Sequence, residues 1–414
     1  MKKSLFAVAA LSAIAGGAQA QSSVTVYGLI DAGYVGSNTR LSTSNAASYP
    51  AGQARTTANG FTGKGAEQTS RLGFKGNEDL GGGTSAFFTY EVEMYPQDQN
   101  VSSDTTNGLL NRQSFVGLKK NGLGQAAVGL QYTPVFNLGA ATDPGANNNV
   151  IGNVTYQASG YAKDASNQGY NGSYTNRTAN TLSFKTDNFA GFTASGIYTL
   201  ANSNATIQTS SSGGNTNASG WGLAADYTWN KLYVGAAIQQ LKQLTYTSNL
   251  LAVSTSNNVP WISAQPSSGT TATGGAGLAT TNGLNVQDNQ YLVGATYDFG
   301  ILKAYAQYVS RTASATQNSN YYAKRTAEQI GVRSYITPTI EGWASAGLGR
   351  YTAMGTQQPA ANFNGWQLGT NYYLSKRTNL YGIYGQMIQS TAAYGTTTVS
   401  SSASMYALGL RHTF

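Results

Sequence analysis

Residues 85–95 read SAFFTYEVEMY, and side chains of opposite character alternate along this stretch. One face carries Ala86, Phe88, Tyr90, Val92 and Met94. The other face carries Phe87, Thr89, Glu91 and Glu93. A period of two residues predicts a β-strand with two different environments. The same alternation recurs in residues 24–31, 221–229 and 302–311.

The environments of the two faces favour a membrane barrel over a soluble β-sandwich. The apolar faces end in aromatic residues such as Tyr90, Tyr227 and Trp229, as expected for the aromatic belts at membrane interfaces. The opposite faces carry charges in the middle of strands, where a water-filled lumen would hydrate them. No segment has the roughly 18 consecutive apolar residues that a membrane-spanning helix needs.

Connections of alternating length set the number of strands. Short turns are predicted at Asp79–Gly83, Lys120–Gly124, Thr186–Gly191, Trp229–Lys231, Phe299–Ile301, Thr337–Thr339 and Ser375–Thr378. Long loops are predicted at 36–66, 96–110, 133–175, 202–219, 243–288, 312–325, 353–362 and 391–403. These connections join sixteen strands of about ten residues. The predicted fold is an all-β, 16-stranded antiparallel transmembrane β-barrel with short periplasmic turns and long external loops.

Composition excludes several classes of protein. The chain has 414 residues, no Cys, one His and only 10% charged residues, with a net charge of +8. The missing Cys excludes disulfides and thiolate chemistry, and a single His leaves little for a general base or a zinc site. We therefore expect no enzyme, no metal and no cofactor. The basic residues are spread over the strands, so a nucleic-acid partner is not expected.

The N-terminal residues indicate export. Lys2 and Lys3 precede a short apolar stretch, and small residues lie at 18–20. This pattern predicts a signal peptide over residues 1–20, cleaved between Ala20 and Gln21, with a barrel domain over 21–414. The expected location is the cell outer membrane, reached through the periplasm.

The last residues also alternate and end in an aromatic ring. We expect one face to point to lipid and to serve as the assembly signal for the barrel-assembly machinery; it comprises Tyr406, Leu408, Leu410, His412 and Phe414. His412 is interpreted as an interfacial aromatic residue near the rim, not as a catalytic group.

Several short motifs resemble a known family. They are SVTVYG at 23–28 followed by Asp31, RLGFKG at 71–76, FVGL at 115–118, YLSKRT at 373–378 and the ending GLRHTF at 409–414. In this order and placement the chain resembles the general porins of Gram-negative bacteria, most closely the trimeric porins of the β-proteobacteria. The resemblance implies a homotrimer in which each barrel has its own channel. It also implies that the third long loop folds inward and narrows the pore.

Counting residues back from the turns brings three arginines to one height in the lumen. Arg71, Arg112 and Arg177 are each about ten to twelve residues above a turn, on the second, fourth and sixth strands. We expect Arg71 opposite about residue 90, with Glu91 as its neighbour and Lys75 one pair lower. The family's constriction arginines match these positions, and its nearby Glu matches Glu91. An alternative is that these arginines only form ion pairs that hold the wall.

The opposing side of the constriction is expected from the third loop. Its acidic residues are Asp143 and Asp164, against Lys163. We assign Asp143 to the constriction, although the sequence does not decide which of the two carboxylates faces the pore. Tyr132, Pro134 and Phe136 begin the loop and are expected to anchor its inward course.

The predicted function is passive diffusion of small hydrophilic solutes and ions, with a mild preference for anions. One alternative is a substrate-specific channel for small anions or organic acids. Another is a surface adhesin that uses the external loops, such as 243–288 and 391–403. Lipid and lipopolysaccharide of the outer membrane are the expected surroundings.

Overall fold

A computed structural model describes residues 23–43, 53–97, 101, 109–156, 173–205, 214–247, 286–315, 322–354, 360–394 and 397–414. The predicted signal peptide at 1–20, Lys163 and Asp164 lie outside these residues. Almost all of the described chain is strand, with one helix, α2 (Pro134–Ala141). The strands are β1 (Ser23–Thr43), β2 (Gln53–Thr62), β3 (Arg71–Gly81), β4 (Thr84–Glu93), β5 (Asn111–Lys120), β6 (Gly124–Tyr132), β7 (Arg177–Thr186), β8 (Phe192–Ala205), β9 (Gly214–Trp229), β10 (Leu232–Thr247), β11 (Val286–Asp298), β12 (Lys303–Ala315), β13 (Tyr322–Thr337), β14 (Ile340–Met354), β15 (Ala360–Tyr373), β16 (Thr378–Tyr394) and β17 (Thr397–Thr413).

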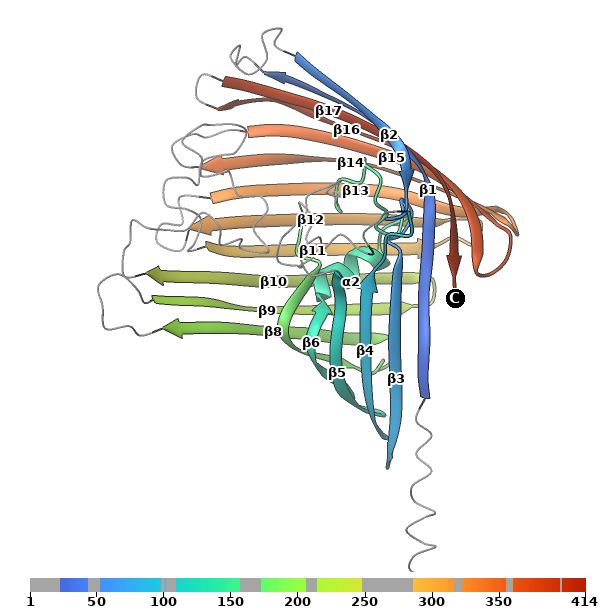
Figure 1. Cartoon of the computed structure of the whole chain (residues 1–414), viewed down its shortest axis with the longest axis vertical. Helices are drawn as coiled ribbons and strands as arrows, with labels where there is room; N and C mark the ends of the chain where they lie inside the picture. Colours follow the sequence, from blue (N-terminus) through green and yellow to red (C-terminus); the bar gives the residue numbers. More distant parts are fainter. Residues whose placement is uncertain are drawn as a thin grey trace, which may run out of the picture.

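The strands form one closed antiparallel ring (Figure 1). Neighbours in sequence pair with each other from β3 to β17, and β17 pairs back onto β1. The last residue joins this closure, because the Phe414 backbone N–H donates to the Gly28 carbonyl at 3.1 Å. Strand β3 pairs with the first half of β1, and strand β2 pairs with its second half. The two strands therefore occupy a single position in the ring. The ring therefore has the sixteen positions that the sequence predicts.

The outer parts of several strands are longer than expected. We predicted a loop at 36–66, but β1 continues to Thr43 and pairs with β2. Strands β8 to β17 have 13 to 17 residues, where about ten were expected. Backbone pairing continues there because polar side chains on both faces suit a strand that has left the lipid. All seven short turns fall at strand junctions as predicted.

Side-chain exposure confirms that the two faces differ. On β17, Tyr406, Leu408 and Leu410 are 43%, 61% and 42% exposed, whereas Met405 and Ala407, which alternate with them, are buried. His412 lies on the exposed face, and its Nδ1 is 2.9 Å from the Thr378 hydroxyl. The outer face is thus apolar and the inner face is covered by other parts of the chain. Among the described residues, no helix is both long enough and apolar enough to cross a membrane.

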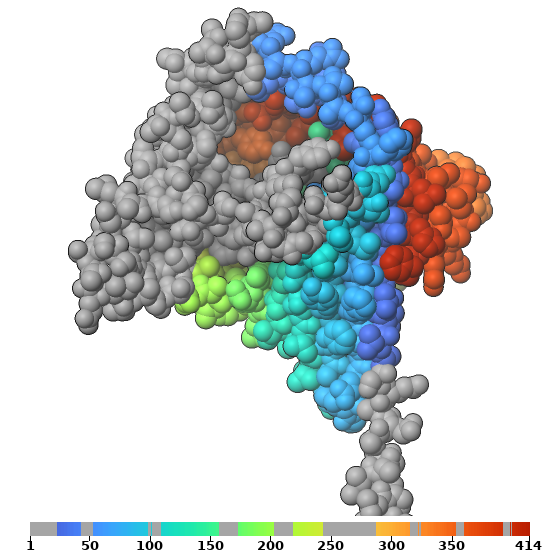
Figure 2. Space-filling view, in the orientation of Figure 1, coloured from blue at the N-terminus to red at the C-terminus, as the bar shows by residue number. Residues whose placement is uncertain are grey.

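Helix α2 and the segment after it lie inside the ring (Figure 1). Thr133 caps the helix, because its hydroxyl accepts from the Phe136 backbone N–H, and Pro134 suits the first turn. Its buried Val135 and Leu138 belong to one hydrophobic cluster with Ala237 of β10, Leu292 of β11 and Val154 of the third loop. In the space-filling view, the more distant orange wall is visible through an opening beside the blue β1–β2 hairpin (Figure 2).

Candidate functional site

Arg112 reaches the lumen because of an irregularity in strand pairing. Glu91 pairs with Gln113 and Val92 with Asn111, so Arg112 is one extra residue between two pairs. Val116 and Leu118, at the same parity further along β5, point outward and are 61% and 57% exposed. A bulge of this kind changes the direction of a side chain without breaking the strand. The Arg112 guanidinium therefore points inward, with its Nε 2.8 Å from a Glu91 carboxylate oxygen.

Arg177 joins this group from β7. Its Nη1 donates to the Arg112 carbonyl at 3.2 Å, and its guanidinium lies 5.8 Å from the centre of the Tyr132 ring. The Tyr132 hydroxyl in turn accepts from Arg112 Nη2 at 2.7 Å. Arg177 is only 7% exposed, and its Nε has no hydrogen-bond partner among the described residues.

Arg71 and Lys75 lie beside this pair on β3. The predicted register was wrong, because Arg71 pairs with Glu93 and not with a residue near 90. The turn lies at Gly82 and Gly83, and a register shift at 79–81 moves the pairing further. Glu91 is still a neighbour of Arg71, since the charge of Arg71 acts on its carboxylate. Lys75 is exposed, with its Nζ 5.3 Å from the centre of the Tyr27 ring.

Asp143 lies apart from Arg71, Arg112, Arg177 and Lys75, in the third loop just after helix α2. It is 3% exposed, and its carboxylate accepts from the Asn147 backbone N–H and from the Asn153 and Gln329 side-chain amides at 2.7–2.9 Å. Burial raises the pKa of Asp143 to about 6, while the charge of Arg333 acts in the opposite direction. These contacts place Asp143 in the attachment of the loop to the β13 wall. The assignment of all six residues to a pore constriction stays a prediction.

A row of buried glutamines on the inner wall was not identified from the sequence. The glutamine row has one member each on β10, β11, β12, β13 and β15, and its members are at most 6% exposed: Gln239, Gln290, Gln307, Gln329 and Gln367. Four of them bind the third loop or helix α2 directly, and Gln239 donates to Gln290. The only signal in the sequence is that each occupies an inward position of its strand.

The amide groups fit the loop backbone because they can donate and accept at once. Gln367 Nε2 donates to the Val150 carbonyl at 2.6 Å, while its Oε1 accepts from the Asn148 amide at 3.0 Å. Gln329 similarly accepts from the Val154 backbone N–H at 3.1 Å and donates to Asp143. The described part of the third loop is therefore fixed against the wall opposite β3 to β7.

Most other inward-facing arginines are neutralised. Among the described residues, ion pairs join Arg112 to Glu91, Arg311 to Asp288, Arg333 to Glu341 and Arg411 to Glu67, at 2.6–3.4 Å. Within the same part of the chain, Arg71, Arg177 and Arg325 form no ion pair. Arg325 instead donates to Ser173 and to the Val154 carbonyl, and lies 4.5 Å from the Phe363 ring centre. Among these seven arginines, the charge without an ion-pair partner in the described chain therefore lies on Arg71, Arg177 and Arg325.

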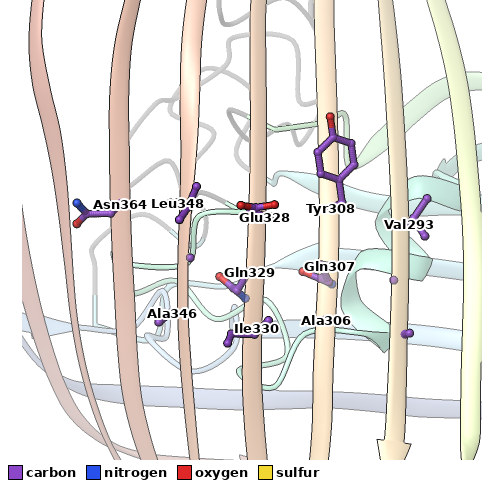
Figure 3. Close-up of a pocket in the computed structure, with 13 residues that line it drawn as sticks. Val293, Ala306, Gln307, Tyr308, Glu328, Gln329, Ile330, Ala346, Leu348 and Asn364 are labelled. Carbon is purple, nitrogen blue, oxygen red and sulfur yellow. The ribbon is translucent and has the colours of Figure 1, made fainter.

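A separate groove lies on the outer face of the wall and not in the lumen (Figure 3). Its lining side chains include Val293, Tyr308, Ile330 and Leu348, which point outward and are 45–69% exposed. In the described part of the chain, no cluster of His, Cys, Asp or Glu could hold a metal ion.

Comparisons with known proteins agree with this geometry. The family described as Gram-negative porin matches residues 7–392. Outer membrane porin protein 32 of Delftia acidovorans is 34% identical over 200 residues, 47% of this chain and 48% of that protein. This match therefore spans about half of the relative's length. An outer membrane porin of Bordetella pertussis is 24% identical over the full length of both chains. The structure of an anion-selective porin from Comamonas acidovorans shares the fold, with a TM-score of 0.62, 22% identity and coverage of 95% of this chain and 100% of that chain.

Proposed function

The chain belongs to the family of Gram-negative porins, and from this membership we propose that it forms a water-filled channel in the outer membrane for passive diffusion of small hydrophilic solutes and ions. The observation that supports this function best is the closed ring with an apolar outer face and a polar inner face. Such a ring leaves no backbone group unpaired in hydrocarbon. Passive diffusion needs no catalytic group and no cofactor.

We further propose a mild preference for anions. The lumen-facing cluster has three guanidinium groups, on Arg71, Arg112 and Arg177, and the carboxylates of Glu91 and Glu93 offset part of their charge. Positive side chains at a narrowing lower the barrier for anions and raise it for cations. The preference should be modest because most other inward arginines are paired.

A bilayer measurement tests this selectivity. In a KCl gradient across a planar bilayer, we expect the reversal potential to favour Cl⁻ over K⁺. The double variant Arg71→Gln with Arg177→Gln should shift it toward cations, because it removes two guanidiniums that form no ion pair among the described residues. The matched control, Arg333→Gln with Glu341→Gln, removes one ion pair without changing the net charge and should leave the potential unchanged. Equal shifts in both variants would contradict a role for Arg71 and Arg177.

Membership of the porin family also supports proposals about assembly and export. We propose that the protein is a homotrimer. Crosslinking in mild detergent should then give a ladder of bands that ends at three chains. We propose that lipopolysaccharide surrounds the barrel and that the barrel-assembly machinery recognises the last strand.

We also propose cleavage after Ala20, so that intact mass spectrometry of the exported protein should show Gln21 as its first residue.

A further inference from the structure

Four aromatic rings form a row from the end of β6 into the third loop. The rings of Tyr132 and Phe136 are stacked, with centres 4.4 Å apart and planes inclined by 11°. The rings of Phe136 and Tyr156 meet edge to face with their centres 6.4 Å apart, and the ring centres of Tyr156 and Tyr174 are 6.2 Å apart. Tyr174 is buried, whereas Tyr132, Phe136 and Tyr156 keep part of their surface exposed. We call Tyr132, Phe136 and Tyr156 the exposed aromatic row.

The exposed aromatic row is directly beside two of the lumen guanidiniums. Arg112 Nη2 binds the Tyr132 hydroxyl, and Arg177 lies over the Tyr132 ring. Tyr156 is close enough for the charges of both arginines to act on its hydroxyl. Arg177 Nε is a buried donor without a partner among the described residues, although buried donors are nearly always bonded. A ligand oxygen could occupy this position.

From this juxtaposition we propose that the channel has a binding site for aromatic carboxylates, formed by Arg177, Arg112 and the exposed aromatic row. The inference rests on the proposed channel function and assigns it a solute class. A carboxylate would accept from the guanidinium donors, which bind planar oxyanions well. The ring of the same solute would lie against Phe136 or Tyr156 in a tilted or stacked geometry. A simple anion uses only the first of these contacts.

A matched pair of probes separates ring stacking from charge. Benzoate and cyclohexanecarboxylate have the same charge and a similar size, but only benzoate is aromatic and planar. Each would be added to single channels in a planar bilayer, and the duration of transient current blocks would be recorded. We expect blocks by benzoate to last about two- to tenfold longer than blocks by cyclohexanecarboxylate.

Variants at Phe136 test whether the difference in block duration between the two probes depends on its aromatic ring. Phe136→Leu keeps an apolar side chain on helix α2 but removes the ring, so it should abolish the difference between the probes. Phe136→Trp should retain the difference, which excludes a general disturbance of the loop. The control Phe115→Leu removes another ring of the inner wall, one that pairs with Phe87 and not with the arginines, and should behave as the unchanged protein.

The outcomes distinguish this inference from the proposed function. Equal block durations for the two probes, in an open channel that still prefers Cl⁻, would overturn the aromatic site and leave the porin function intact. A difference that persists in Phe136→Leu would also overturn it. Absence of any channel current would instead contradict the proposed function itself.

Discussion

At the scale of single residues, the buried position of Arg112 is stable because Glu91 neutralises its charge. Their side chains form a buried ion pair, and removing one partner of such a pair leaves an uncompensated charge. Arg112→Met should lower the free energy of unfolding by about 3–5 kcal/mol. Arg112→Met with Glu91→Gln should recover most of that loss. Urea unfolding followed by gel mobility would measure both, and additive losses would argue against the pair.

The residue Asp143 provides a pH dependence. Burial raises its pKa in the folded loop to about 6, above its ordinary value of 3.8, so the folded loop holds the proton more tightly than the free loop. The attachment of the loop is therefore strongest below 3.8 and weakens as the pH rises through about 6. The change is at most about 3 kcal/mol, at roughly 1.4 kcal/mol per pKa unit.

Limited proteolysis between residues 143 and 156 can detect this change. We expect faster cleavage at pH 7.5 than at pH 5 in the unchanged protein. Asp143→Asn, which resembles the protonated acid, should be cleaved at one rate at both values once the protease's own pH dependence is subtracted. A variant that keeps the full pH dependence would show that another group titrates.

The sequence predicted that Arg71, Arg112 and Arg177 lie close together, but it did not predict their contacts. Arg71 and Arg177 both lie near Arg112, as their similar distances from the turns led us to expect, although the register of Arg71 differs from the predicted one. The bulge at Arg112 could not be predicted, since it depends on how two strands pair and not on either strand alone. The buried place of Asp143 was missed for a similar reason, because its partner Gln329 is 186 residues away.

At the scale of elements, the glutamine row fixes the position of helix α2 and the third loop. Gln329→Leu with Gln367→Leu removes both amides, so Asp143 and the Val150 carbonyl lose a donor. Each buried group left without its hydrogen bond costs about 1–3 kcal/mol. We expect noisier open-channel current, while the barrel itself keeps its resistance to heat.

A variant on the opposite face of β15 is the control for this prediction. Asn364→Leu changes a side-chain amide that is exposed on the outer face of β15 and lines the outer groove. Its current should remain as quiet as that of the unchanged protein. Equal noise in both variants would assign the effect to the barrel wall in general.

The elements themselves followed from the sequence with three exceptions: the outer ends of the strands, strand β2, and helix α2, which was predicted only as part of the third loop. Alternation and turn residues gave all seven short turns, because each turn interrupts the period of two. The outer ends of the strands were underestimated, since Ser, Thr and Asn on both faces resemble a loop until their partners are known. Strand β2 was missed for this reason and was predicted as part of the first loop.

At the scale of the whole molecule, we expect the barrel to fold only if the ring of strands can close. Deleting residues 405–414 removes most of the pairing between β17 and both of its neighbours, β1 and β16. We expect this variant to lose the compact, heat-sensitive gel mobility of a folded barrel. Removal of ten residues from 248–285, between β10 and β11, should leave the mobility shift in place. A compact form of the truncated chain would contradict the need for closure.

The pairing of β1 with β17 also determines when folding can finish. The first strand emerges early in synthesis but gains one of its two neighbours only after nearly the whole chain exists. Contacts so distant in sequence form slowly, and until then each intermediate has two unpaired edges that can join other chains. A cell that exports this protein must therefore keep the finished chain unfolded and protected in transit, because no stable fragment can form on the way.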